Sequence, residues 1–238
     1  MNKQFTVIGF GGSLMIPKFQ EEDGINLAYL KAFRAFLKSQ MKAGRKFIVV
    51  VGGGKTCRVY QKEAGKLTKP SDRMLDWIGI RATHLNASLI QTIFEKEAYP
   101  ELIDRKPTVE ELKKMFRENI SLYVAGGWTP GWSTDFISMN LASMFGAKEV
   151  IDAGDIRYVY DKDPKKFTDA KPIKRISWKD YRKLIPADWT PGLAAPIDPV
   201  ASKFAEKAGI TAKILRGDDL QNMKKAVEGK IFEGTIIM

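Results

Sequence analysis

Cysteine and histidine each occur once in this sequence, as Cys57 and His84. One cysteine cannot form a disulfide within the chain, which is typical of proteins from a reducing compartment, so we expect a cytoplasmic protein. Cys57 begins a predicted helix and is expected to pack rather than to act as a nucleophile. His84 stands in the middle of another predicted helix without a second histidine to share a metal ion. We therefore predict a structural role for His84 and no dedicated metal-binding residues.

Long apolar runs are also missing. The longest ones are short and interrupted by polar residues, which predicts no membrane span. The first residues, MNKQFTVIGFGG, lead directly into a glycine-rich turn and contain no small-residue cleavage site. We therefore interpret them as the first strand of the fold rather than as a signal peptide.

Acidic residues are fewer than basic ones: the chain has 28 aspartates and glutamates and 39 lysines and arginines, which gives a net charge of +11. Such an excess can indicate binding to nucleic acid. Here the basic residues are scattered along the chain, and no nucleic-acid recognition motif accompanies them. We therefore expect a solvated basic surface that attracts small anionic substrates, and no nucleic acid as a partner.

The chain does contain an alternation of short apolar runs with amphipathic stretches. The run KFIVVV (46–51) is apolar throughout, as expected of a parallel strand covered on both faces. We predict strands at 5–10, 46–51, 121–125, 149–152 and 212–215, and helices at about 26–42, 55–65, 73–97, 109–118, 134–145, 198–208 and 218–228. This alternation predicts an α/β fold with a mainly parallel sheet and helices on both faces. The polar, turn-rich stretch 156–176 predicts a hairpin or an excursion over the sheet edge.

Glycine-rich turns follow three of the predicted strands: GFGGS (9–13), GGGKT (52–56) and GGWTPG (126–131). In a parallel sheet these turns meet at the carboxyl ends of the strands, where open α/β folds bind ligands. Glycine lets backbone N–H groups approach an anion, and the N-terminus of the next helix adds partial positive charge. The three turns therefore predict a phosphate-binding site. The P-loop of the NTPases is excluded, because its motif needs a glycine five residues before Gly54, where Val49 stands.

Seven short motifs follow one another along the chain: GGS (11–13), VVVGGGKTCR (49–58), DWIGIRATHLNA (76–87), GGWTPGWSTD (126–135), VYDKDPKK (159–166), IDPVASK (197–203) and EGTII (233–237). In order and spacing they resemble the amino acid kinase family, and within it the archaeal-type uridylate (UMP) kinases. The resemblance implies one domain over 1–238, folded as a three-layer αβα sandwich around a mainly parallel sheet. It implies an acceptor-binding half at about 1–150 and an ATP-binding half at about 151–238. It also implies phosphoryl transfer from ATP to UMP with magnesium (Mg2+) in pyrimidine nucleotide biosynthesis, by a homohexamer.

The same resemblance implies roles for single residues. Gly12, Arg58 and Asp135 match catalytic positions, and Asp135 would orient a cation beside the reacting centre. The positions implied for ATP are Gly11, Gly12, Ser13, Gly54, Arg58, Gly154, Asp155, Tyr160 and Asp163. The positions implied for UMP are Gly53, Asp76, Gly127, Trp128, Thr129, Pro130, Gly131, Trp132, Ser133 and Thr134. Among these, Asp76 matches a ribose-binding aspartate, and Tyr160 and Asp163 match residues that hold the base and ribose of ATP.

One departure from the family pattern concerns a lysine. Many relatives carry it where this chain has Gly9. Its absence predicts that another cation, from Lys55, Lys165 or Lys166, takes over its role.

Other departures concern the nucleotide pockets. Gly154 and Asp155 replace a threonine and an asparagine, and an Arg-Tyr pair at 157–158 replaces Asp-Gly, so we expect a remodelled adenine pocket. On the acceptor side, His84 stands where relatives often carry arginine. Trp128 and Trp132 replace smaller or polar residues, and they either stack on the acceptor or pack beneath the loop.

These departures leave other functions open. One alternative is a kinase of the same family that acts on a carboxylate, a carbamate or another phosphate. A second is a non-catalytic nucleotide-binding or storage protein that kept the fold, which Gly9 makes possible. Asp198, followed by Pro199, predicts the N-cap of a helix rather than a catalytic group.

Overall fold

The computed structural model describes residues 5–17, 24–118, 120–188, 190 and 195–238. Residues 1–4, part of the start interpreted above as a first strand, lie outside the described part. Along the chain the elements are β1 (Phe5–Phe10), α1 (Gly12–Met15), α2 (Leu27–Lys42), β2 (Lys46–Val51), α3 (Gly54–Leu67), α4 (Asp72–Ile93), α5 (Val109–Arg117), β3 (Leu122–Ala125), α6 (Thr134–Met144), β4 (Glu149–Gly154), β5 (Val159–Tyr160), β6 (Pro172–Ile173), β7 (Arg175–Ile176), α7 (Trp178–Tyr181), α8 (Pro199–Ala208), β8 (Thr211–Arg216), α9 (Leu220–Val227) and β9 (Thr235–Ile237).

Within the described part, seven strands form one sheet in the order β3-β2-β1-β4-β8-β9-β7. The pairs β1/β2, β1/β4, β2/β3, β4/β8 and β7/β9 are parallel, and β8/β9 is antiparallel. Strand β1 joins the two predicted halves, because it pairs with β2 on one side and with β4 on the other. The carboxyl ends of β1, β2, β3 and β4 therefore meet at one edge of the sheet.

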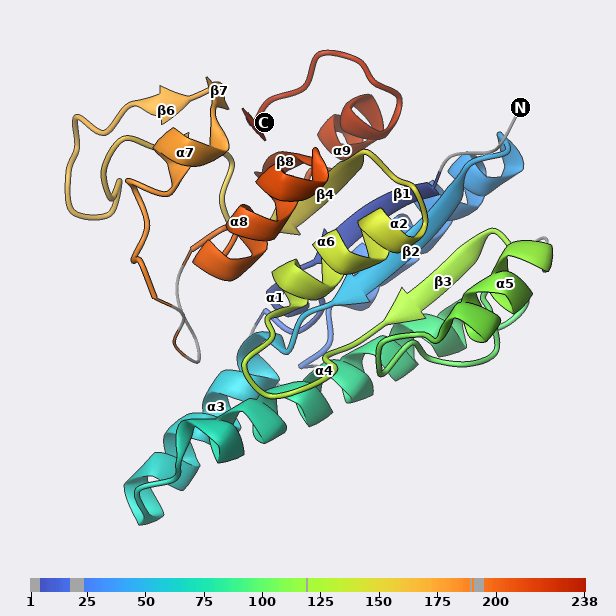
Figure 1. The fold of residues 1–238 in the computed structure, drawn as a ribbon, viewed down its shortest axis with the longest axis horizontal. Coiled ribbons are helices and arrows are strands. Elements are labelled where there is room, and N and C mark those ends of the chain that lie inside the picture. Colours follow the sequence, from blue (N-terminus) through green and yellow to red (C-terminus); the bar gives the residue numbers. More distant parts are fainter. Residues whose placement is uncertain (1–4, 18–23, 119, 189, 191–194) are drawn as a thin grey trace.

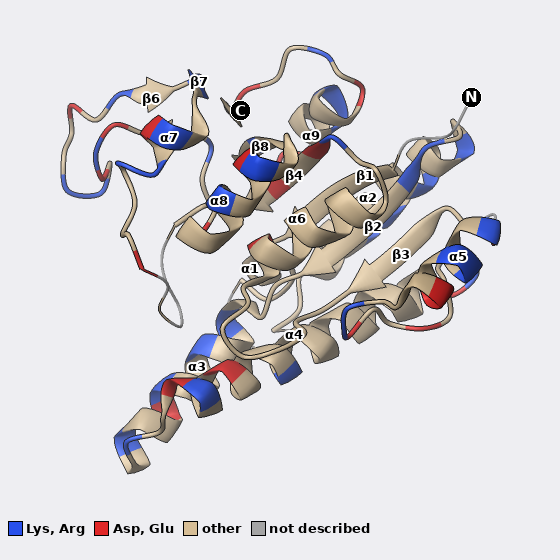
Figure 2. Ribbon diagram, in the orientation of Figure 1, with Lys and Arg blue, Asp and Glu red and all other residues tan. Residues whose placement is uncertain are grey.

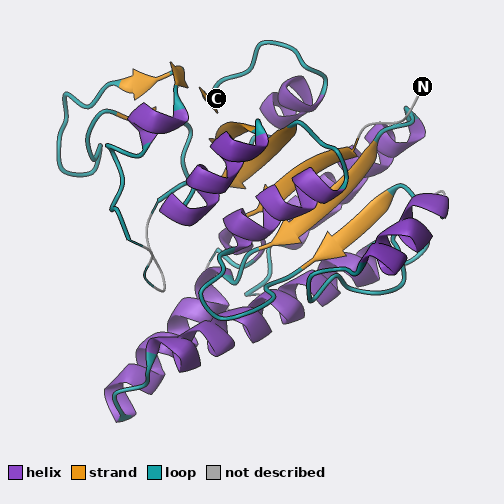
Figure 3. Cartoon of the chain, viewed as in Figure 1, coloured by secondary structure: helices purple, strands orange, loops and turns teal. Residues whose placement is uncertain are grey.

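Helices cover both faces of this sheet (Figures 1 and 3). Because side chains alternate along a strand, Ile8 and Phe10 of β1 join a core with α2, α4 and α9, whereas Val7 joins a core with α6 and α8. Phe33 of α2 and Ile137 of α6 are fully buried in these two cores. Two cores on opposite faces of one sheet make a three-layer αβα sandwich, which confirms the predicted fold class. Helices α3 and α4 run side by side and extend beyond the sheet (Figure 1).

The five predicted strands are confirmed as β1, β2, β3, β4 and β8, and each predicted helix has its counterpart. The predicted end of the helix 73–97 is wrong, because α4 ends at Ile93. Tyr99 precedes a proline, which disfavours helical backbone, and its N–H donates to the carbonyl of Leu122 in β3. The chain after α4 is thus drawn along the sheet edge. The short elements α1, α7, β7 and β9 were not predicted.

The excursion predicted for residues 156–176 leaves the main sheet after β4, and its last two residues return to that sheet as β7 beside β9. Strands β5 and β6 pair antiparallel in a separate two-stranded sheet. The hydroxyl of Thr235 in β9 accepts from the N–H of Val159 at 2.8 Å and donates to the carbonyl of Ile173 at 2.5 Å. The EGTII motif therefore ties this excursion to the last strand.

Lysine and arginine are spread over α3, α5, α7, α9 and the loop between β5 and β6, often next to acidic residues (Figure 2). This distribution agrees with the scattered basic residues of the sequence. Among the described helices, none is both long and apolar enough to cross a membrane.

Candidate active site

The glycine-rich turns after β1 and β2 touch each other. A Cβ on Gly12 would lie 2.6 Å from the nitrogen of Gly54, and a Cβ on Gly54 would lie 2.5 Å from the carbonyl carbon of Gly12. Gly54 also has a φ of +58°, which residues with a side chain rarely adopt. Only glycine fits at both positions, and both line the same pocket.

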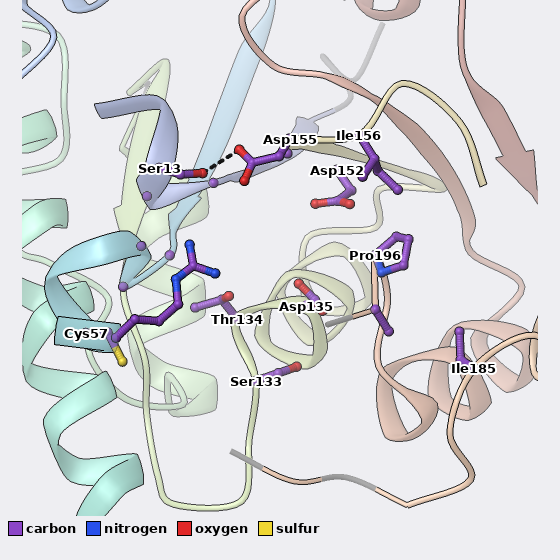
Figure 4. A pocket seen from close by; sticks show the side chains of 18 of the residues that line it. Ser13, Cys57, Ser133, Thr134, Asp135, Asp152, Asp155, Ile156, Ile185 and Pro196 are labelled. Atoms are coloured by element: carbon purple, nitrogen blue, oxygen red, sulfur yellow. Dashed lines mark hydrogen bonds between the residues drawn. The ribbon is translucent and has the colours of Figure 1, made fainter. Parts of the chain in front are cut away.

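This pocket has a volume of about 770 Å³ and opens at the carboxyl edge of the sheet (Figure 4). A volume in this range is typical of small-molecule sites. Residues from both predicted halves line it, so the residues predicted to bind the acceptor and those predicted to bind ATP share one cavity. The predicted site residues that line it are Gly11, Gly12, Ser13, Gly53, Gly54, Arg58, Asp76, Gly127, Trp132, Ser133, Thr134, Asp135, Gly154, Asp155, Tyr160 and Asp163.

Residues 126–132 form a loop that is predicted to bind the acceptor and is called the acceptor loop below. Four of its predicted site residues do not line this pocket: Trp128, Thr129, Pro130 and Gly131. The last three line a neighbouring depression of about 490 Å³, together with Arg73, Asp76 and Trp77. Asp76 borders both cavities, and its Oδ2 accepts from the N–H of Gly131 at 2.7 Å. This hydrogen bond holds the loop between the two cavities, and no described residue forms a hydrogen bond with Asp76 Oδ1.

The two tryptophans of the loop have different surroundings. Trp128 is 7% exposed, belongs to the core under α6 and α8, and donates from Nε1 to the carbonyl of Ile103 at 3.2 Å. Trp132 is half-buried, lines the pocket and packs edge-on against Phe136 with ring centroids 4.8 Å apart. Trp128 therefore supports the loop from beneath, and Trp132 is the indole within reach of a ligand.

Two carboxyl groups lie together in the pocket, Asp135 in the first turn of α6 and Asp152 on β4 (Figure 4). Burial raises the pKa of Asp135 well above its ordinary value, and the charges of Asp152 and Asp198 raise it further. Burial also raises the pKa of Asp152, with a smaller contribution from the charge of Asp155. No described lysine or arginine forms an ion pair with either carboxylate. The pair therefore favours the arrival of a positive charge.

Asp198 is confirmed as the N-cap of α8, because its Oδ1 accepts from the N–H groups of Val200 and Ala201. Its other oxygen accepts from the hydroxyl of Ser133. The Ser133 oxygen in turn caps α6 by accepting from the N–H of Phe136 at 2.9 Å. One buried carboxylate thus ties together the first turns of α6 and α8, and with them the start of the helix that carries Asp135.

Among the residues predicted to bind ATP, the hydroxyl of Ser13 donates to Asp155 Oδ1 at 2.6 Å and links the turn after β1 to the end of β4 (Figure 4). Tyr158 and Tyr160 both line the pocket, with ring centroids 6.5 Å apart and planes at 84°. Two aromatic rings therefore border the region for which the resemblance implies the base of ATP.

The candidate cations are distributed unequally. Of the three lysines predicted to replace the family lysine, Lys165 lines the pocket. Lys55 points outward from α3 as an exposed residue, and Lys166 lies 4.0 Å from the carboxylate of Asp163. Arg58 also lines the pocket, from the second turn of α3. Lys165 and Arg58 are therefore the cations of this set that line the pocket.

The sequence prediction missed several residues of the pocket. Asp152 has a recognisable signal, because it is a lone carboxylate in the apolar strand EVIDAG. Others carry none, because only the fold brings them to the pocket. Gln61 comes from α3 and Thr83 from α4, whereas Ile156 follows β4 and Ile185 follows α7.

The comparison with known proteins agrees with this geometry. The uridylate kinase of Staphylothermus marinus is 36% identical over 78% of this chain and 81% of its own length. The uridylate kinase of Methanocaldococcus jannaschii is 31% identical over 96% of this chain and 99% of its own. Among solved structures, the uridylate kinase of Archaeoglobus fulgidus superposes with a TM-score of 0.77 at 29% identity, covering 98% of this chain and 99% of that one.

A second solved structure, the UMP kinase of Ureaplasma parvum, has a TM-score of 0.78 over 100% of this chain and 99% of its own. At 17% identity this likeness concerns the fold alone. The sequence model of the amino acid kinase family matches residues 4–216. With a family match over most of the sequence, relatives above 30% identity and a shared fold, the chain belongs to the amino acid kinase family.

Proposed function

We propose that the protein is a nucleoside monophosphate kinase that transfers the γ-phosphoryl group of ATP to UMP and releases ADP and UDP. One pocket carries this proposal. In it, the turns of Gly12 and Gly54 touch each other, with the acceptor loop on one side and the rings of Tyr158 and Tyr160 on the other. Two nucleotides bound on the two sides would meet at these turns. Relatives named uridylate kinase support UMP as the acceptor.

The residues suit this chemistry. UMP brings its own attacking phosphate oxygen, so the protein needs no strong general base. Catalysis then consists mainly of alignment and of neutralising charge on the moving phosphoryl group. Backbone N–H groups of the glycine turns, the N-terminus of α3 and the guanidinium of Arg58 supply donors and positive charge there.

Magnesium belongs to the same proposal. Mg2+ in kinases is held by one or two carboxylates together with phosphate oxygens of the substrate, and it neutralises the charge of those phosphates. Asp135 and Asp152 fit this need, because both line the pocket and neither has an ion-pair partner among the described residues. The described residues hold no cluster of three or more ligands, so the phosphates would complete the coordination.

Assembly and location extend the proposal. We propose a homohexamer in the cytoplasm that contributes to pyrimidine nucleotide biosynthesis. Apolar side chains on α2, α3 and α4 remain exposed and would be covered by neighbouring subunits: Leu27, Tyr60, Met74 and Leu85 are each more than half exposed. Light scattering should give the mass of a hexamer at micromolar protein, and a monomer mass would refute this assembly.

The reaction is tested by coupled detection of ADP with ATP, Mg2+ and UMP. Wild-type protein should release ADP in a UMP-dependent manner. Arg58→Met should lower kcat by about 10²-fold, the usual effect of losing one electrostatic contact to the reacting group. Arg117→Met, on the exposed face of α5, is the matched control and should retain activity. If the folded protein gives no UMP-dependent release of ADP, the proposal that it is a UMP kinase is refuted.

The two alternatives are separated by a panel of acceptors. Other nucleoside monophosphates, carboxylates and carbamate replace UMP under the same conditions. Turnover on one of them alone would identify a different kinase of the family. Saturable ATP binding without turnover on any acceptor would identify a nucleotide-binding protein without catalysis.

A further inference from the structure

The backbone of the acceptor loop lies unusually close to helix α4. A Cβ on Gly126 would lie 2.7 Å from Cδ2 of His84 and 3.1 Å from the hydroxyl oxygen of Thr83. A Cβ on Gly127 would lie 3.1 Å from the same hydroxyl and from Cγ1 of Ile80. The two glycines that open the loop are therefore needed because the loop is pressed onto the helix.

Two consecutive residues of α4 hold both polar groups of Gly127. Its N–H donates to the hydroxyl oxygen of Thr83 at 2.6 Å, and its carbonyl oxygen lies 2.7 Å from Nε2 of His84. The Thr83 hydroxyl hydrogen points away, because it donates to the carbonyl of Ile80 at 2.6 Å. A carbonyl oxygen can only accept, so Nε2 of His84 must carry the proton.

This contact fixes the start of the loop. Further along, the N–H of Gly131 donates to Asp76, also on α4. The loop is thus attached to one helix at Gly127 and at Gly131, immediately before Trp132 reaches the pocket. Movement of the Gly127 carbonyl would shift the acceptor side of the pocket and leave the ATP side untouched.

We propose that His84 is a positioning residue for the acceptor: its Nε2–H holds the Gly127 carbonyl and thereby sets the conformation of loop 126–132 that binds the acceptor. The effect of His84 on acceptor affinity rests on the proposed function. The contact between its imidazole ring and the loop does not. The sequence predicted only a structural role for His84, because it is the only histidine of the chain, and this proposal replaces that prediction.

The contact itself is tested without any activity measurement. Because His84 is the only histidine, labelling with 15N-histidine gives the signals of one imidazole ring. Long-range 1H–15N correlation spectra distinguish the two tautomers of a neutral imidazole ring, so they are recorded over a series of pH values. The expected result is a ring protonated at Nε2. A ring protonated mainly at Nδ1 would overturn the proposal.

The effect on the acceptor is tested with two variants and a control. His84→Leu removes the donor and should raise the KM for UMP about 5- to 10-fold, the usual effect of losing one buried hydrogen bond, while the KM for ATP stays unchanged. His84→Gln keeps an N–H near the position of Nε2 and should recover most of the loss. Ser88→Ala is the control. Ser88 lies one turn further along α4, where its hydroxyl donates to a carbonyl of the helix backbone, so this variant should behave as wild type.

Hydrogen–deuterium exchange separates the possible failures. Loop 126–132 should exchange about 10-fold faster in His84→Leu than in wild type or Ser88→Ala, because the loop opens more often without this bond. Unchanged exchange, an unchanged KM for UMP in the folded Leu variant, or a Gln variant as impaired as the Leu variant would refute the positioning role. If wild-type protein does not phosphorylate UMP, the proposed function fails, and the NMR and exchange results alone decide whether His84 holds the loop.

Discussion

Replacing Asp152 with asparagine should stabilise the nucleotide-free protein, and the gain should depend on pH. Burial and the charge of Asp155 raise the pKa of Asp152 from its ordinary value of 3.8 to about 7. A carboxyl group whose pKa is raised by folding binds its proton more tightly in the folded state. Its contribution to stability is therefore complete at low pH and is lost as the pH rises from about 4 through about 7. Asparagine carries no charge and avoids this loss.

The size of the gain follows from the pKa change. A rise from 3.8 to about 7 corresponds to at most about 4 kcal/mol in the free energy of unfolding, at about 1.4 kcal/mol per pKa unit. Asp152 borders the open pocket and is only half-buried, so solvent screening reduces this to about 2 kcal/mol. For a chain of this length, about 2 kcal/mol raises Tm by about 4–8 °C.

Calorimetric melts of the ligand-free protein measure this directly. The Tm difference between Asp152→Asn and wild type should grow between about pH 4.5 and about pH 7.5 and remain constant above that range. Asp104→Asn, at an exposed loop position, is the matched control and should show no such growth. A Tm difference that is the same at both ends of the pH range would mean that Asp152 ionises freely in the folded protein, and the reasoning would be refuted.

Three further outcomes are expected. Lys165→Met should lower kcat by about 10²-fold if Lys165 replaces the family lysine, whereas Lys166→Met should retain activity; equal kcat values for Lys165→Met and wild type would contradict this. Gly54→Ala should lower the free energy of unfolding by about 2–3 kcal/mol because of its positive φ and the close turn beside it, whereas Gly65→Ala on the open side of α3 should be neutral or slightly stabilising in the same denaturant titration. Trp132→Phe should remove most of the change in intrinsic fluorescence on UMP binding and raise the KM for UMP, and a full signal in this variant would make Trp132 a packing residue only.

The sequence was sufficient to predict five strands of the main sheet but not β7 and β9. KFIVVV and its neighbours are apolar enough to be recognised as buried strands, and their order along the chain defines the parallel core. The pair β7 and β9 depends on contacts between residues far apart in the sequence, such as Arg175 with Ile236, and two or three residues carry no periodic pattern. The predicted end of α4 was wrong for a similar reason. The hydrogen bond from the N–H of Tyr99 to Leu122 of β3 joins residues far apart in the sequence and draws the chain away from the helix.

The acceptor loop shows the same limit within the site. GGWTPGWSTD indicates a ligand-binding loop, but it cannot distinguish its two tryptophans. Burial separates them, because the indole of Trp128 finds a hydrogen-bond acceptor in the core, whereas that of Trp132 remains beside the pocket. His84 likewise looks structural by sequence, and only its distance to the Gly127 carbonyl gives it a specific partner.

The absence of a lysine at position 9 and the raised pKa values of Asp135 and Asp152 are two aspects of one electrostatic feature. A Cβ on Gly9 would lie 3.6 Å from Oδ1 of Asp152, so a lysine at this position would project beside that carboxylate. With glycine there, the protein itself provides no described ion-pair partner for Asp135 and Asp152, and their pKa values are raised. The charge that ionises the pair must then be brought close to it, by Mg2+ on the nucleotide or by a pocket-lining cation such as Lys165. A lysine at position 9 would supply this charge permanently, whereas in this chain we expect the charge to be coupled to nucleotide binding, so that ligand binding also releases protons from the site.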